Sequence, residues 1–271
     1  TSQIKIKWNS ATDFPLIPSV RENLVFNLKS NIIKKSIEKT LFSSAEWNIR
    51  PTLAWIYVSL DWNKARFATT DSFRLSEFKV DLENQISETF SQIIPSKTAF
   101  ELKSILWDLE DVKVIAWDNQ LVFVIWNTKF YSRLLNGKFP EYEGFFPNNY
   151  NTKAVVNRVD LMQALKKINL LSRENNYSIK MSFSGESGIL IETSETQVWE
   201  AKVYLVWAID WEDSIVWLNS EYLLEVLWVI DTTHVSISFE SALSPILIKW
   251  ISDDENKKID DFRHIIMPLK I

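Results

Sequence analysis

The sequence predicts an α+β fold of two similar domains, each with helices packed on antiparallel sheets. The order helix, sheet, helix, sheet occurs twice along the chain. Aligning Ile32 with Leu161 and Pro95 with Asn219 gives a repeat of roughly 125 residues, far longer than the units of solenoid proteins. Hydrophobic residues make up 46% and charged residues 24% of the 271-residue chain, so it has an ordinary globular composition and enough length for two cores.

In the first half, we expect a helix capped by Ser30, with Ile33 and Ile37 on its apolar face. A second helix begins at Pro95 and Ser96 and places Ala99, Leu102 and Leu106 inside. Alternating apolar residues predict strands at 54–60, 64–69, 74–80, 112–116, 121–125 and 129–134.

The second half repeats this pattern. One helix is expected to be capped by Asp160 and to bury Leu161 and Leu165, and Asn219 is expected to cap another. The strands predicted in this half lie at 179–183, 188–193, 235–239, 246–249 and 264–268.

One turn combines features that a partner molecule would contact. Thr70, Asp71 and Ser72 form a polar turn between two strands, since Asp and Ser bond the local backbone. An apolar and basic segment, 73–75, leaves this turn. Paired with the apolar segments 139–142 and 267–269, it predicts a groove with apolar walls and Arg74 and Lys270 on a polar rim. The alternative is that these apolar residues belong to an ordinary core.

Several protein classes are disfavoured by composition. No run of about 18 apolar residues predicts a membrane span, and no signal peptide begins at Thr1, where the missing Met suggests a truncated start. The absence of Cys excludes disulfides and suits a reducing compartment. The net charge of −5 means that any nucleic-acid contact must come from a local basic face.

No constellation predicts catalysis. His234 and His264 are the only histidines, and a lone His with a neighbouring Asp supplies too few ligands for zinc. His264 lies in an apolar strand, where a structural role is expected. Phosphate-binding glycine motifs are absent, and the acidic clusters 108–111 and 253–255 lack the spacing of a calcium loop. We therefore predict neither an enzyme nor a cofactor.

Basic residues gather on three predicted helices and are candidates for sequence-independent DNA contact through phosphates. The alternative is that they only solvate these helices, and the fourth helix carries Glu221 and Glu225 instead. The candidates are Lys34, Lys35, Lys39, Lys97, Lys103, Lys166, Lys167 and Arg173.

Tryptophan and glycine occur in abnormal numbers. The chain has 13 Trp and 4 Gly, whereas Gly makes up roughly 7% of average proteins. Trp62 and Trp211 follow Asp between strands, where hairpins favour Gly, and Trp107 follows a helix end. We hypothesise that the source decodes UGA as Gly, whereas the printed sequence was translated with UGA read as Trp. These Trp residues would then be Gly in the natural protein. The alternative is a Trp-rich surface for sugars or partners.

Several motifs resemble the bacterial DNA polymerase III β subunit, the sliding clamp, along essentially the whole chain. They are the runs at 50–55, 68–75, 94–97, 137–142, 222–227 and 265–269. Trp55, Trp62, Trp126 and Trp199 fall where that family commonly has Gly.

The resemblance implies a tandem clamp-type fold, in which three similar domains per chain and two chains form a ring around duplex DNA. Residues 1–21 would be a remnant of the first domain, 22–148 the second domain and 149–271 the third. Because the family's ring joins the first domain of one copy to the third of another, these residues alone should not form the normal ring.

The resemblance also implies that polymerase and clamp-loader peptides bind a groove between the second and third domains. This sequence departs from the family at four positions of this groove. Members commonly have Gly at position 72, where this chain has Ser72, and some have His at position 73, where it has Phe73. Some members have Arg at the positions of Gly144 and Lys270. The residues that match the family's groove are Leu53, Thr70, Ser72, Phe73, Arg74, Leu75, Pro140, Gly144, Phe145, Ile265, Ile266, Met267, Pro268, Leu269 and Lys270.

These features together predict a non-catalytic processivity factor of the bacterial cytoplasm, associated with the nucleoid, which encircles DNA and is a homodimer when full length. The alternative is a clamp-like protein that binds partner peptides but never loads on DNA.

Overall fold

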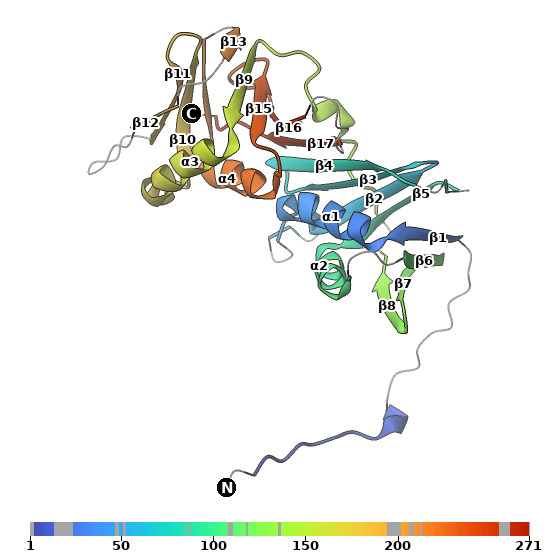
Figure 1. Cartoon of the computed structure of the whole chain (residues 1–271). Coiled ribbons are helices and arrows are strands. Elements are labelled where there is room, and N and C mark those ends of the chain that lie inside the picture. The colour runs from blue at the N-terminus through green and yellow to red at the C-terminus, as the bar shows by residue number, and fades with distance from the viewer. Residues whose placement is uncertain are drawn as a thin grey trace.

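The computed structural model describes most of the chain, and the following account concerns that part. The described residues are 3–13, 24–46, 49–50, 53–83, 85–86, 88–107, 111–117, 119–134, 137–193, 202–205, 209–211 (backbone only), 213–254 and 261–270. A short 3-10 helix, η1 (Ala11–Asp13), lies far from the folded body in Figure 1.

The first unit contains two helices and eight strands. Its elements are β1 (Leu24–Lys29), α1 (Ser30–Thr40), η2 (Leu41–Ser43), β2 (Trp55–Asp61), β3 (Lys64–Thr70), β4 (Arg74–Asp81), β5 (Phe90–Pro95), α2 (Ser96–Ile105), β6 (Asp111–Trp117), β7 (Gln120–Ile125) and β8 (Thr128–Arg133). Strands β1-β6-β7-β8 form one antiparallel sheet, while β2 to β5 belong to a larger one. Residues 137–150, which include η4 (Glu143–Phe145) and are called the connector below, lead to the next unit.

The second unit repeats this organisation. Its elements are β9 (Thr152–Asn157), α3 (Arg158–Ser172), η5 (Arg173–Asn175), β10 (Ser178–Ser184), β11 (Gly188–Thr193), β12 (Lys202–Leu205), β13 (Ile209–Trp211), β14 (Ser214–Asn219), α4 (Ser220–Val229), β15 (His234–Phe239), β16 (Ile246–Ile251) and β17 (Asp261–Ile266). Strands β12-β11-β10-β14 form its separate sheet.

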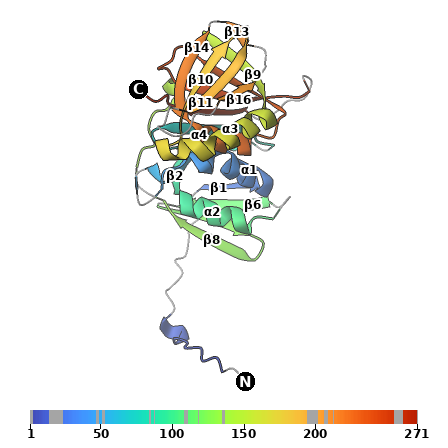
Figure 2. The same ribbon diagram turned by 90° about the vertical axis from the view of Figure 1, so that its left-hand side faces the viewer.

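A nine-stranded sheet runs through both units in the order β13-β9-β15-β16-β17-β4-β3-β2-β5. The units join where β17 pairs antiparallel with β4, from Asp261 opposite Lys79 to Ile266 opposite Arg74. Because this pairing continues the backbone hydrogen bonds without a break, the junction is as regular as the interior of each unit. The four helices lie together on one side of the molecule (Figure 2).

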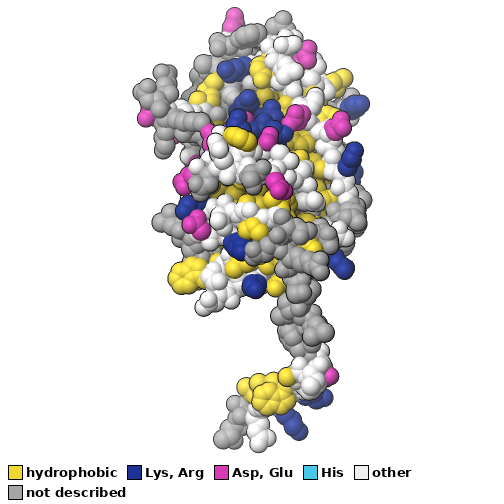
Figure 3. All heavy atoms as spheres, turned by 90° about the vertical axis from the view of Figure 1, so that its right-hand side faces the viewer, with side chains coloured by type: hydrophobic (Ala, Val, Ile, Leu, Met, Phe, Trp, Pro, Cys, Tyr) yellow, Lys and Arg dark blue, Asp and Glu magenta, His cyan; other side chains and the backbone are white. Residues whose placement is uncertain are grey.

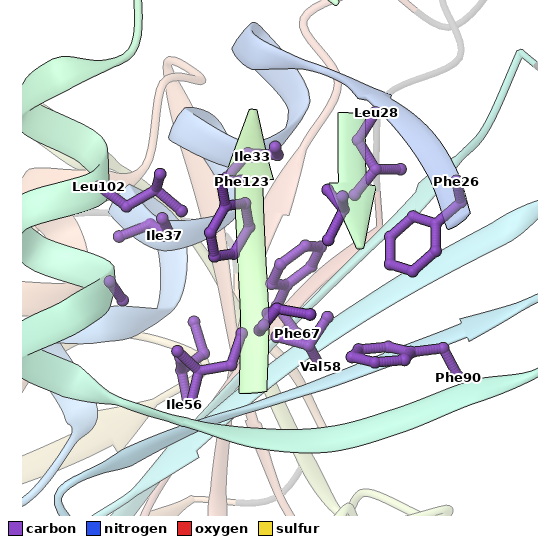
Figure 4. Close-up of a pocket in the computed structure, with 14 residues that line it drawn as sticks. Phe26, Leu28, Ile33, Ile37, Ile56, Val58, Phe67, Phe90, Leu102 and Phe123 are labelled. Carbon is purple, nitrogen blue, oxygen red and sulfur yellow. The ribbon is translucent and has the colours of Figure 1, made fainter. Parts of the chain in front are cut away.

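Each unit has its own hydrophobic core under its helices. In the first unit, side chains from α1, α2 and both sheets converge on Phe67 and Phe123 (Figure 4), and they leave a cavity of only about 30 Å³. An apolar space of this size is a packing gap rather than a ligand site. Phe78 of β4 belongs to the core of the second unit, so the two cores meet across the junction.

The structure confirms the predicted helices and eleven predicted strands, with shifted ends, but corrects two helix caps. The α1 N-cap is Lys29 without a side-chain hydrogen bond, not Ser30, which is buried. The α3 N-cap is Asn157 rather than Asp160, and its side chain accepts from the backbone N–H of Val159 and Asp160. Asn219 caps α4 as predicted. Strands β1, β5, β9, β12, β13 and β14 were not predicted.

Candidate functional site

The turn between β3 and β4 is held by its own side chains. Asp71 Oδ1 accepts from the backbone N–H groups of Phe73 at 2.9 Å and Arg74 at 3.0 Å, and Thr70 Oγ1 donates to the Arg74 carbonyl at 2.7 Å. Ser72 has φ of 79°, a left-handed conformation that is uncommon for a residue other than Gly. The local Asp and Thr bonds hold this backbone and therefore fix the direction in which the turn projects.

The C-terminal tail is bound to this turn. After β17 ends, the Met267 N–H donates to the Phe73 carbonyl at 2.8 Å, and the Leu269 N–H donates to the Trp217 carbonyl at 2.8 Å. The tail therefore runs from the turn of the first unit to β14 of the second unit.

A groove of about 260 Å³ lies between the turn, the tail and the connector. Leu75, Ile265 and Tyr142 form its buried base, and Phe145 and Met267 are partly exposed at 53% and 38%. The groove therefore offers apolar side chains that water covers when nothing is bound. Its lining residues are Leu53, Thr70, Ser72, Arg74, Leu75, Pro140, Tyr142, Phe145, Ile265 and Met267.

Arg74 is buried rather than part of a polar rim. Its guanidinium donates to Asp71 Oδ2 at 3.0 Å, to Glu225 of α4, and to the Phe42 carbonyl at 2.9 Å. It also lies 4.3 Å from the centre of the Tyr222 ring. Since Glu225 and Tyr222 belong to the second unit, Arg74 fastens the wall of the groove to α4.

A second buried polar cluster lies on the helix side of the junction. Ser76 Oγ is 2.5 Å from Ser43 Oγ and 2.7 Å from His264 Nδ1. Complete burial, together with the positive charge of Arg74, holds the pKa of His264 well below its usual value. The imidazole is neutral, completely buried and hydrogen-bonded to a serine. These surroundings suit the structural role that was expected from its place in an apolar strand.

Glu77 forms a third cluster on the opposite face of β4. Burial alone would raise the pKa of its carboxyl, but hydrogen bonds and charges from Arg263, Lys79 and the Tyr142 hydroxyl hold it below its usual value. The Tyr142 hydroxyl donates to Glu77 Oε1 at 2.9 Å. Burial first, and then the adjacent Glu77 charge, raises the pKa of Tyr142, so this hydroxyl stays a donor.

The structure brings nine of the fifteen predicted groove residues into the groove. Phe73 lies outside the groove with its side chain 51% exposed, and the Arg50 guanidinium carbon is 4.9 Å from the centre of its ring. Gly144 lines a neighbouring hollow, and Ile266 is buried in the core of the second unit. Pro268, Leu269 and Lys270 lie farther along the tail and do not line the groove.

Sequence reasoning missed Tyr142 and Arg50. Tyr142 belongs to the apolar segment 139–142 already singled out, but its burial against Glu77 depends on the path of the connector. Arg50 donates to the Asp71 carbonyl at 2.9 Å, and the Arg-Pro pair at 50–51 was the only signal for it.

The candidate DNA-facing residues differ in their surroundings. Lys39 cannot face DNA as was expected, because it is 5% exposed and its amine donates to Asp231 and to the Val229 carbonyl across the junction. Lys35 lies over the Phe78 and Trp250 rings, Lys103 is 3.7 Å from Glu38, and Lys166 is 4.3 Å from the Trp228 ring centre. Lys34 is half-buried, while Lys97, Lys167 and Arg173 are exposed.

Other kinds of site find little support in the described part of the chain. It holds no group of three or more His, Cys, Asp or Glu residues placed to bind a metal ion. No described helix has the length and apolar character needed to cross a membrane. On the face opposite the helices, acidic, basic and hydrophobic side chains are mixed (Figure 3).

Comparison with known proteins gives one consistent result. Residues 27–141 match the model of the DNA polymerase III β subunit central domain, and residues 144–270 match that of its C-terminal domain. A β sliding clamp of Staphylococcus epidermidis is 32% identical over 93% of this chain and 67% of its own length. One from Streptococcus pneumoniae is 29% identical over 99% of this chain and 70% of its own.

Solved structures agree with this match. The DNA polymerase III β chain of Streptococcus pneumoniae has a TM-score of 0.89 at 27% identity, covering 97% of this chain and 69% of that one. The DNA polymerase sliding clamp of Bacillus subtilis has a TM-score of 0.88 at 26% identity, covering 96% and 68%.

The repeated units, the shared sheet and the groove at its junction define a clamp-type protein. The chain belongs to the DNA polymerase III β subunit family, the β sliding clamps. It spans 65% of the length of the Bacillus subtilis relative and 70% of the streptococcal one.

Proposed function

We propose that this protein is a DNA sliding clamp, a processivity factor that encircles duplex DNA and tethers the replicative polymerase and other partners. It is a non-catalytic subunit of the polymerase. The observation that carries the proposal is the groove at the β4–β17 junction, because it offers apolar walls next to a tightly fastened turn in a protein of the β clamp family.

We propose that the groove binds short peptide segments of the polymerase and the clamp loader. Partly exposed Met267 and Phe145 supply contact surface, and the buried base supplies a rigid support. Of the residues assigned from the sequence, Leu53, Thr70, Ser72, Arg74, Leu75, Pro140, Phe145, Ile265 and Met267 remain in the proposed site, and Tyr142 is added.

The test uses a short peptide with adjacent Leu and Phe side chains, chosen to match the apolar walls. Met267→Ala is expected to weaken its binding about tenfold, since roughly 1.4 kcal/mol of apolar contact is lost. Leu243→Ala, which truncates an exposed apolar side chain between β15 and β16 away from the groove, is the matched control and should leave the affinity unchanged. Isothermal calorimetry measures both. If the wild-type protein and Met267→Ala bind the peptide with equal affinity, the peptide binds outside this groove.

Sequence-independent DNA contact is proposed for the helix side of the molecule. Helices α1 to α4 lie together on that side (Figure 2), and the exposed basic residues of this set are Lys97, Lys167 and Arg173. Lys39 is withdrawn from the proposed set because its charge is paired with Asp231. Contacts of this kind go to phosphates and position the duplex without reading bases.

We also propose a ring assembly. With a further domain of the same kind, two copies would close into a homodimeric ring, and residues 22–148 and 149–271 would be the second and third domains.

The runner-up function is a clamp-like peptide-binding protein that never loads on DNA. A coding region for the first domain upstream of Thr1 favours the clamp, and its absence from the gene favours the runner-up. We place the clamp in the bacterial cytoplasm, with the nucleoid.

The hypothesis that UGA is decoded as Gly gains support at two turns. Trp62 and Trp126 have φ of 49° and 51° and are 62% and 79% exposed, a combination that suits Gly and not a large aromatic residue. By contrast, Trp55 and Trp250 are buried, so the argument from turns does not extend to them. The codons in the gene decide: TGG at these sites rejects the hypothesis, and TGA upholds it.

A further inference from the structure

A second hollow of about 530 Å³ lies beside the groove, on the face of the nine-stranded sheet that points away from the helices. Tyr57, Arg66, Phe139 and Glu143 line it, and Pro140 and Tyr142 line both the hollow and the groove. The two spaces are therefore neighbours separated by one short piece of the connector.

Strand register gives the path between them. Thr70, Ala68 and Arg66 alternate along β3 and point to the same face of the sheet, and Tyr57 of β2 lies opposite Ala68. Thr70 lines the groove, whereas Arg66 lines the second hollow. At about 3.3 Å per residue, four residues of β3 separate the two by about 13 Å, which an extended peptide of about four residues spans.

The boundary between the two spaces is rigid. Tyr142 is 4% exposed, its hydroxyl donates to Glu77, and its ring meets those of Tyr57 and Phe139 edge to face at 6.1 Å and 5.6 Å. At about 260 Å³ the groove alone is smaller than typical ligand sites of ~300–1,000 Å³, whereas the two spaces together fall within that range.

The second hollow combines an aromatic surface with a replaceable ion pair. The Tyr57 and Phe139 rings stack at 5.1 Å. Arg66 Nη1 donates to Glu143, and the two side chains are 36% and 63% exposed. Because exposed ion pairs contribute little to stability, a carboxylate of a ligand can take the place of Glu143.

We propose that the second hollow extends the groove and binds the flanking residues of the same partner peptide. An apolar side chain of the flank lies on Tyr57 and Phe139, and an acidic side chain accepts hydrogen bonds from Arg66. The partner is thus an extended segment with an apolar anchor and, about four residues away, an acidic and an apolar residue. This inference rests on the proposed peptide-binding function of the groove.

The experiment compares three fluorescent peptides on the wild-type protein: the short Leu-Phe peptide, and the same peptide extended by four residues that include Glu and Phe, at either its N- or its C-terminal end. One of the two extensions is expected to tighten binding about tenfold, from an added apolar contact and a charge-assisted hydrogen bond. Phe139→Ala and Arg66→Gln should each remove most of this gain and leave the affinity of the short peptide unchanged.

Matched controls come from the same protein. Phe100→Ala on α2 and Arg133→Gln on β8 remove an exposed Phe and an exposed Arg elsewhere, and should keep the full gain. If the short peptide binds and neither extension improves its affinity, the inference is overturned and the groove assignment stands. If the gain survives both Phe139→Ala and Arg66→Gln, the flank binds elsewhere. If no peptide binds, the proposed function itself fails along with the inference.

Discussion

Arg74, Glu77 and His264 are buried within a few residues of one another at the junction of β4 and β17, and each is satisfied in a different way. Arg74 has three hydrogen-bond acceptors from two units, and Glu77 is held by opposite charges. His264 is neutral, its Nδ1 is hydrogen-bonded to Ser76 Oγ and its ring packs against Phe42, while its Nε2 has no hydrogen-bond partner among the described residues. A junction built this way loses stability when any one of these groups changes its charge.

His264 makes the stability of the junction depend on pH. Its folded-state pKa lies well below the unfolded value of about 6.5, so the unfolded chain takes up a proton before the folded one does. The free energy of unfolding is therefore greatest above pH 6.5 and falls by up to about 1.4 kcal/mol per unit as the pH drops below it. Urea titrations between pH 7.5 and 5 measure this slope.

Two variants isolate the effect. His264→Asn is expected to flatten the slope, whereas His234→Gln, which changes a partly exposed histidine, should retain it. A slope that persists in His264→Asn would assign the pH dependence to another group.

Arg74 is expected to contribute more to stability than any exposed basic residue. Arg74→Ala leaves the Asp71 carboxylate without its ion-pair partner and removes the link to Glu225, so the free energy of unfolding should fall by about 3 kcal/mol. Arg173→Ala, on the exposed η5 segment, should change it by less than about 0.5 kcal/mol. Chemical denaturation compares them, and an equal effect of the two substitutions would show that the Arg74 contacts are not stabilising.

The hairpin turns and helix ends are the elements where local sequence and structure disagree. Trp62 and Trp126 stand in turns that need positive φ, and Lys29 stands at a helix start where Ser30 was expected to cap. Central strands were predictable because their apolar residues alternate, as in β10 and β11. The edge strands β12 and β13 were not, since short edge strands carry little alternation and depend on neighbours distant in sequence.

The two turns yield a stability prediction. Trp62→Gly and Trp126→Gly should each raise the free energy of unfolding, by about 1 kcal/mol, because Gly adopts φ near +50° without steric cost. Trp250→Gly should lower it by about 3 kcal/mol or more, since it removes a buried ring from the Phe78 and Phe262 contacts. Thermal and urea unfolding measure all three, and a loss of stability at both turns would contradict this account.

The whole molecule is organised by the sheet that continues across β4 and β17. The repeat in the sequence predicted two units of one kind, but nothing in it predicted which strands would join them, because that pairing is set by long-range register. The same limit applies to the groove. Its residues come from four separate segments. The sequence pattern paired the turn with the segments 139–142 and 267–269, whereas Leu53, Phe145 and Ile265 were assigned to the groove through the family resemblance. The place of Tyr142 at its base depends on the three-dimensional path of the connector.

Assembly provides a prediction at this scale. The 271-residue chain by itself is expected not to form a closed two-fold ring, since the proposed ring needs a further domain in each copy. Analytical ultracentrifugation and negative-stain electron microscopy of these residues measure this. A stable, closed dimeric ring would contradict the proposed assembly.

The most direct test of the clamp proposal is retention on DNA. The protein as encoded by its gene, loaded by its clamp loader on a nicked circular plasmid, is separated from free protein by gel filtration in high salt. Encirclement predicts that it stays on the circle in salt that screens phosphate contacts, and that it is released when the plasmid is linearised. Equal retention on circular and linear DNA, or complete release from the circle by salt, would contradict the proposal that this protein is a sliding clamp.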